Sequence, residues 1–173
     1  ERLLGITVGK SNPPNGWNEF PLTAPLKLKA GQFYWIQIWS NDKDARVYYS
    51  SQTGGKLRWL AWPYGDWPDP IVMDPNGSEY LYCLYGEGTF DPPKPRATIG
   101  NTTDGTFRDY ITDGSTTPPT AYINGNRFQA SADMTLTSIK AKIENAPGEY
   151  KCAVYSDGPD TLADRLLGFT VGK

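Results

Sequence analysis

Carboxylates and aromatic rings are the side chains of this sequence with the most evident chemical potential. The chain has no histidine, which excludes Ser-His-Asp and Cys-His catalysis and histidine-ligated zinc. Paired carboxylates, as in glycoside hydrolysis, are the catalytic option that remains, and the candidates beside aromatic residues are Asp66, Asp69 and Glu87. No recurring motif surrounds them, and Asp beside Gly and Pro is typical of turns. We therefore expect no enzymatic activity and assign no catalytic residue.

A tryptophan-rich segment, residues 54–77, suggests a second kind of chemistry, the stacking of sugar rings on aromatic faces. The segment is too aromatic to remain solvated, so we expect a structured loop. Its candidate glycan-binding residues are Trp59, Trp62, Tyr64, Trp67 and Asp66, which Phe33, Trp35 and Trp39 can extend. The alternative, which we favour, is that these rings pack over one sheet as a second small core.

Two polar loops carry oxygen atoms that suit Ca²⁺. The first, SNDKDA, contains Asn41, Asp42 and Asp44, and the second contains Asp157, Asp160 and Asp164. Neither matches a Ca²⁺ loop pattern, and Lys43 interrupts the first. We expect solvated turns and no metal site or cofactor, with Ca²⁺ as the lesser alternative.

The cysteines and the glycosylation sequons bear on the compartment. Cys83 and Cys152 both lie in strand-like runs, and two cysteines alone do not form a structural zinc site. We expect a disulfide between them, which by chain entropy would stabilise the fold by about 4 kcal/mol. Two separate buried thiols are the alternative. The sequons at Asn76 and Asn101 lie in turn-like contexts, which permits surface N-glycosylation and agrees with an extracellular location.

Composition and periodicity predict the elements that position these residues. Gly, Pro, Trp and Tyr are abundant, and no stretch of ten or more residues shows helical periodicity. About ten strands separated by turns predict an all-β chain, an antiparallel β-sandwich that is jelly-roll-like. In the strand at 33–39 we expect Tyr34, Ile36 and Ile38 to face the core and the aromatic face to be covered by a loop or exposed. Asn124-Gly125 predicts a tight turn.

The charge and the hydropathy exclude several partners. The net charge is −2, the pI is about 5.1, and lysine and arginine are scattered, which argues against nucleic acid or an anionic membrane as a partner. No apolar run approaches the roughly 18 residues of a membrane helix, so we expect no membrane span. No signal peptide is recognised, and we expect a mature or internal fragment.

The first ten residues of the sequence recur as its last ten. ERLLGITVGK (1–10) and DRLLGFTVGK (164–173) agree at eight of ten positions with a period of 163, which indicates consecutive units of a tandem array. Alternation predicts a strand with an apolar face, formed by Leu4, Ile6 and Val8 in one copy and by Leu167, Phe169 and Val171 in the other. We expect both copies to claim the same place in a sandwich, so that one of them enters a neighbouring unit.

A pattern of short runs emerges when the second half of the chain is read before the first. The runs are Tyr155-Ser156-Asp157, Leu166-Leu167, Gly16-Trp17-Asn18, Leu26, Gly31, Tyr34-Trp35 and Tyr48-Tyr49. This pattern resembles an extracellular β-sandwich repeat module of prokaryotic and phage surface proteins. Such modules are appended to hydrolases, adhesins and filament or tail proteins and carry no catalytic motif.

The resemblance implies where one unit ends and the next begins. Residues 1–95 would be the C-terminal part of one unit and residues 96–173 the N-terminal part of the next, with the boundary in the proline-rich run DPPKPRA (91–97). Together the two parts would form about one sandwich domain. Cys83 and Cys152 would replace ordinary apolar strand residues of the module, as a disulfide pair would.

These observations lead to one expected function and one alternative. We expect a non-catalytic structural or adhesive unit of an extracellular tandem-repeat or filament-forming surface protein. Its partners would be copies of itself or neighbouring repeats, joined head to tail through the repeated strand. The alternative is a carbohydrate-binding module that uses the aromatic loop and is appended to a polysaccharide-active enzyme or adhesin.

Overall fold

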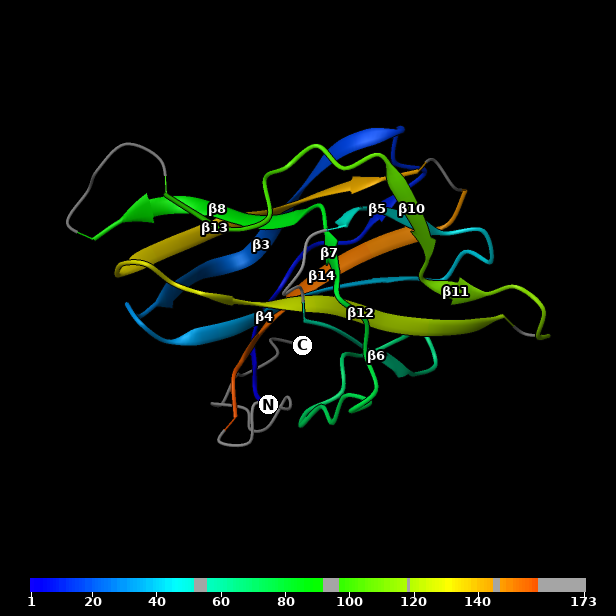
Figure 1. The fold of residues 1–173 in the computed structure, drawn as a ribbon, viewed down its shortest axis with the longest axis horizontal. Coiled ribbons are helices and arrows are strands. Elements are labelled where there is room, and N and C mark those ends of the chain that lie inside the picture. Colours follow the sequence, from blue (N-terminus) through cyan, green and yellow to red (C-terminus); the bar gives the residue numbers. More distant parts are fainter. Residues whose placement is uncertain (52–55, 92–96, 118, 145–146, 159–173) are drawn as a thin grey trace.

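The computed structural model describes residues 1–51, 56–91, 97–117, 119–144 and 147–158. In this part of the chain two antiparallel sheets pack face to face and no helix is present (Figure 1). The all-β sandwich predicted from the sequence is confirmed. The described residues form fourteen strands, several of them very short, where about ten were expected. They include no helix that is long and apolar enough to cross a membrane.

The first sheet contains seven of these strands. They are β1 (Leu3–Ile6), β2 (Lys10–Ser11), β4 (Phe33–Ser40), β6 (Leu57–Ala61), β11 (Thr112–Asp113), β12 (Thr120–Gln129) and β14 (Glu149–Ser156). Their order is β1–β14–β4–β12–β11, with β2 beside β14 and β6 beside β12.

The second sheet contains the other seven. They are β3 (Gly16–Leu28), β5 (Arg46–Ser51), β7 (Tyr80–Tyr82), β8 (Leu84–Phe90), β9 (Ala97–Gly100), β10 (Phe107–Tyr110) and β13 (Met134–Ile143). Their order is β10–β5–β13–β8–β9, with β3 beside β13 and β7 beside β5. In Figure 1, β8 and β13 lie in the upper layer, and β4 and β12 lie in the lower layer.

Strands from the two parts of the chain alternate in both sheets. β14 lies between β1 and β4, and β13 lies between β3 and β8. The described residues of the two predicted parts, 1–95 and 96–173, therefore both contribute strands to each sheet.

The main core lies between the sheets and follows the alternation of the strands. On β4, Tyr34, Ile36 and Ile38 are buried in it, as predicted. They meet aliphatic side chains of β13 and β14, among them Leu136 and Val154. Burial of such side chains contributes about 1.5–3 kcal/mol each, so this layer supplies much of the stability.

A second core covers the outer face of the first sheet. Trp35 and Trp39 of β4 are fully buried there, although they point away from the main core. The irregular segment after β6 lies over them and contributes Ile71 and Met73. An exposed face with two tryptophans would be a large apolar patch, which the covering loop removes. The structured loop expected from the sequence is thus confirmed.

The predicted turn at Asn124-Gly125 is wrong, because β12 runs unbroken through both residues. Gly125 pairs with Gln37 of β4 on one side and with Arg58 of β6 on the other. A Cβ atom at this position would lie 2.0 Å from the Ile36 carbonyl oxygen. Glycine is therefore required here by the close approach of two backbones and not by a turn.

Candidate functional site

β1 lies in a slot between β14 of the first sheet and β3 of the second. On one side it pairs with β14, with Leu3 opposite Tyr155 and Ile6 opposite Ala153. On the other side Thr7 forms a bridge with Leu22 of β3. Two further hydrogen bonds join this side to β3, from Val8 N to Pro21 O at 3.1 Å and from Thr23 Oγ1 to Ile6 O at 3.1 Å. We name this place, occupied by residues 3–7, the β1 slot.

Leu3, Gly5 and Thr7 are the residues of the β1 slot that are buried. Leu3 enters the second core. Thr7 Oγ1 donates a hydrogen bond to Cys152 O at 3.2 Å and accepts one from Cys152 N at 2.8 Å. A Cβ atom on Gly5 would lie 3.5 Å from Leu22, so the strand fits closely against β3.

The predicted core-facing set of this strand is wrong at Val8, which is 60% exposed. The register shifts between Leu3 and Gly5, and this irregularity breaks the alternation. As a result, the half-buried Leu4 contacts the main core and the half-buried Ile6 contacts the second core.

The second copy of the strand lies outside the described residues, together with its predicted core-facing residues Leu167, Phe169 and Val171. Its sequence corresponds position by position to that of the first copy, which occupies the β1 slot. The residues buried in the slot, Leu3, Gly5 and Thr7, recur as Leu166, Gly168 and Thr170, whereas the buried Glu1 that precedes the slot is replaced by Asp164. The two differences are Ile6 to Phe169, at a half-buried position, and Glu1 to Asp164, which keeps the carboxylate. The second copy therefore keeps the side chains that the slot buries.

The proposed glycan platform is divided between two faces of the first sheet. Tyr64, Trp67 and the neighbouring Asp66 belong to the loop over the second core. Trp59 instead packs against the main core, and Trp62 is 42% exposed. The structure therefore does not bring these five residues together as one surface.

A lysine of β14, Lys151, lies over the aromatic rings of the loop and of the strand beneath it. Lys151 Nζ lies 4.4 Å from the ring centroids of both Trp39 and Tyr64 and 5.4 Å from that of Trp67. It also donates a hydrogen bond to the Gly65 carbonyl oxygen. Burial lowers the pKa of this ammonium group. The cation–π contacts explain why these rings gather here.

The predicted disulfide is wrong, because Cys83 and Cys152 are both free and both buried. Cys152, on β14, lies in the main core. Cys83 lies between β7 and β8 of the other sheet, and its sulfur accepts a hydrogen bond from Gly105 N at 3.2 Å. Burial raises the pKa of both thiols. The alternative of two separate buried thiols is correct.

The two sequons differ in their surroundings. Asn76 is exposed in the loop after β6, as the sequence suggested. Asn101 is 5% exposed, and its Nδ2 donates hydrogen bonds to Ser50 Oγ, Leu81 O and Tyr82 O at 3.1–3.3 Å. A glycan on this nitrogen would displace those bonds, so Asn101 is not the exposed glycosylation site that the sequence suggested.

The role of Asn101 leads to a stability prediction. Asn101→Ala should lower the free energy of unfolding by about 2–3 kcal/mol, because it removes hydrogen bonds to the Leu81 and Tyr82 carbonyl groups in a buried place. Asn76→Ala, the matched control at the exposed sequon, should change it by less than about 0.5 kcal/mol. Urea denaturation of both variants measures the difference. Equal midpoints would contradict the structural role of Asn101.

The carboxylates considered for catalysis or Ca²⁺ have other surroundings. Asp66 and Asp69 are exposed, and Glu87 forms an ion pair with Lys140 at 2.7 Å. Asp42 Oδ1 accepts a hydrogen bond from Asp44 N at 2.8 Å, which is turn geometry. Asn41 Oδ1 accepts a hydrogen bond from Glu149 N, and Asp157 forms an ion pair with Arg127. The other two Ca²⁺ candidates, Asp160 and Asp164, lie outside the described residues. Among the described residues, no three His, Cys, Asp or Glu side chains are placed to hold a metal ion.

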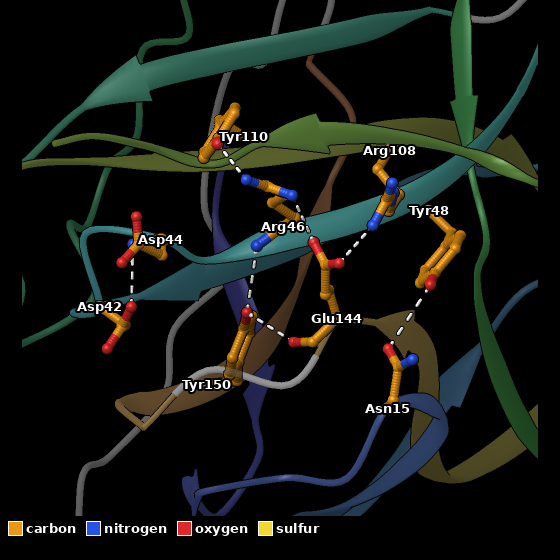
Figure 2. Close-up of polar contacts among 9 residues, drawn as sticks. All are labelled: Asn15, Asp42, Asp44, Arg46, Tyr48, Arg108, Tyr110, Glu144 and Tyr150. Carbon is orange, nitrogen blue, oxygen red and sulfur yellow. Dashed lines mark hydrogen bonds and ion pairs between the residues drawn. The ribbon is translucent and has the colours of Figure 1, made fainter.

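A network around Arg46 was not predicted from the sequence (Figure 2). Arg46 Nη1 lies 2.8 Å from Glu144 Oε2, and Arg108 pairs with the other oxygen of that carboxylate. The Arg46 guanidinium also lies over the Tyr110 ring, 4.2 Å from its centroid, and donates a hydrogen bond to its hydroxyl group. Tyr150 OH accepts a hydrogen bond from Arg46 N at 3.1 Å and donates one to Glu144 O at 3.2 Å. The network joins β5, β10 and β14 with the end of β13.

Comparison of the chain with family models, with curated proteins and with solved structures found no match.

Proposed function

We propose that this chain is a structural or adhesive unit of an extracellular surface protein, joined head to tail to copies of itself or to neighbouring repeats. The observation that carries this proposal is that the sequence contains two copies of one strand, whereas the described part of the sandwich contains one β1 slot, which the first copy occupies. The recurrence of every buried residue of the slot in the second copy supports it.

The contacts of β1 support strand exchange as the means of linkage. Backbone hydrogen bonds attach residues 3–8 to both β14 and β3, so an incoming strand gains partners on two sides. Strand addition of this kind takes its affinity from main-chain bonds and its specificity from alternate side chains. Leu3, Gly5 and Thr7 supply those alternate positions.

The linkage has a directional consequence. A strand of one unit that enters the slot of the next takes the place of that unit's own first copy and makes a heterologous contact. Repeated contacts of this kind give open chains unless the rotation closes a ring. Filaments or covalent tandem arrays satisfy this geometry. Either form would place the unit in a surface or fibre structure.

Deletion of residues 1–10 tests the proposal. The chain with both copies should form oligomers that lengthen with concentration, whereas the deleted chain, with one strand for one slot, should be a folded monomer. Size-exclusion chromatography with light scattering and electron microscopy measure the two states. Val8→Lys is the matched control, since Val8 is 60% exposed and the substitution should leave assembly unchanged. Unchanged polymers after the deletion would refute the proposal.

Carbohydrate binding by the aromatic loop has less support. Lys151 covers the ring faces that a sugar would need, and Trp59 lies on the other face of the sheet. Loss of polysaccharide binding in a folded Trp62→Ala variant would favour this alternative.

A further inference from the structure

Two hollows that share lining residues, here called the joined hollows, lie beside β6, β10 and β12. The first has a volume of about 290 Å³ and is lined by Trp59, Asp109, Tyr110, Tyr122 and Asn124. The second has a volume of about 470 Å³, shares Tyr110 and Tyr122 with the first, and continues along Lys43, Asp44 and Thr112. Ligand sites of small molecules range from about 300 to 1,000 Å³, so the joined hollows are of suitable size.

Strand pairing places the residues of the first sheet on one wall. Asn124 of β12 lies directly opposite Trp59 of β6. Tyr122 precedes Asn124 by two residues and therefore lies on the same face of β12. The other wall comes from the second sheet, where Asp109 and Tyr110 end β10. The aromatic rings of this site thus come from both sheets.

Tyr110 is held in place although it is 52% exposed. The Arg46 guanidinium lies over one face of the ring, and Glu144 fixes that guanidinium in turn (Figure 2). That face is occupied, so the opposite face of the ring is the one on which a ligand stacks. An aromatic side chain that is already ordered loses little conformational entropy when a ligand stacks on it.

Polar groups accompany the rings. Asp109 accepts a hydrogen bond from Tyr82 OH at 2.9 Å, and burial raises its pKa. Asn124 is almost fully buried, and its Nδ2 donates to Tyr122 O at 2.9 Å. The Thr112 hydroxyl is buried at the second hollow and has no hydrogen-bond partner among the described residues. Its oxygen has almost no accessible surface, so it belongs to the wall of the hollow and is not counted among the groups that bind a ligand.

We propose that the joined hollows bind a neutral oligosaccharide. Its sugar rings stack on Tyr110, Tyr122 and Trp59, and its hydroxyl groups bind the carboxyl and amide groups beside them. Three carboxylates, Asp44, Asp109 and Asp113, line the hollows against two cations, Lys43 and the Arg46 guanidinium over Tyr110, which gives an anionic sugar no advantage. The two hollows meet at the two tyrosines that they share, and a ligand that fills both therefore spans at least two sugar units. This site is independent of the β1 slot.

Native gel electrophoresis through soluble neutral polysaccharides tests the proposal. The gels contain hydroxyethyl cellulose, mixed-linkage β-glucan, glucomannan or dextran, and the full chain should be retarded in at least one of them. Tyr110→Ala and Tyr122→Ala should each weaken the retardation about tenfold or more, as expected when an aromatic anchor of a binding site is truncated. Phe107→Ala is the matched control, because it lies on the same strand and is 54% exposed but lines neither hollow.

The possible outcomes separate the alternatives. Circular dichroism establishes that each variant is folded, and a variant that unfolds is replaced by Tyr110→Leu or Tyr122→Leu, which removes the aromatic ring but keeps a large apolar side chain. Loss of binding in the hollow variants with retention in Phe107→Ala supports the site. Loss in Trp62→Ala alone overturns it and assigns binding to the loop. Absence of retardation in all four polysaccharides also overturns it.

Discussion

Replacement of Gly125 by alanine is expected to lower the free energy of unfolding by about 3 kcal/mol or more, which few single substitutions do. The added Cβ would lie 2.0 Å from the Ile36 carbonyl oxygen and 2.5 Å from Gln37 Oε1. The backbone of β12 has little freedom to move away, because β4 and β6 hold it from both sides. The overlap must therefore be relieved by breaking sheet hydrogen bonds.

Gly65→Ala provides the matched control for this prediction. Gly65 lies in the exposed loop, where a Cβ would approach no atom closer than 3.9 Å. The substitution should change the free energy of unfolding by less than about 0.5 kcal/mol. Urea denaturation monitored by tryptophan fluorescence measures both variants. If Gly125→Ala matched Gly65→Ala, the two backbones would not approach each other as described.

The second large effect is expected at Asp157, which follows β14. Arg127 Nε donates a hydrogen bond to its Oδ1 at 2.9 Å, and the Trp35 indole donates another at 3.0 Å. Both side chains of the ion pair are only 12% exposed. Asp157→Ala should therefore lower the free energy of unfolding by about 3–5 kcal/mol, because it leaves a buried guanidinium without its counterion.

Two further variants separate the buried charge from lost packing. Arg127→Met combined with Asp157→Ala should recover much of the loss, since no uncompensated charge remains. Asp44→Ala removes an exposed ion pair with Lys43 and should cost no more than about 1 kcal/mol. Thermal and urea denaturation report all three. A double variant as unstable as Asp157→Ala would show that packing, and not charge, dominates.

The fold class could be predicted because strand periodicity is a local signal. The alternation on β4 separated Tyr34, Ile36 and Ile38 from the tryptophans, and the structure places the two sets in different cores. The prediction at Asn124-Gly125 failed because the dipeptide is typical of turns, whereas the requirement for glycine comes from a contact with Ile36, distant in sequence. Val8 was misassigned because the irregularity after Leu3 has no local signature.

The sites were harder to predict than the fold, for a related reason. The hollow draws Trp59, Asp109 and Asn124 from strands far apart in sequence, and nothing in the spacing of these residues indicates that they meet. The tryptophan-rich loop was predicted as a binding site because its rings are close in sequence. Its contacts with Lys151 became evident only from the pairing of β14 with β4. The β1 slot was the exception, since its occupant is repeated in the sequence.

The pairing of Leu3 with Tyr155 also has a kinetic consequence. Contacts between residues so distant in sequence form late, because the entropy of closing the loop opposes them until the intervening strands are in place. The edge of β14 thus stays vacant in a nearly complete sandwich until the first strand docks. During this interval a strand from another chain can reach the edge of β14, although the tethered first strand has the higher effective concentration. If units link as proposed, linkage would therefore be fastest while chains fold together, and mature chains would exchange strands only as fast as the first strand detaches.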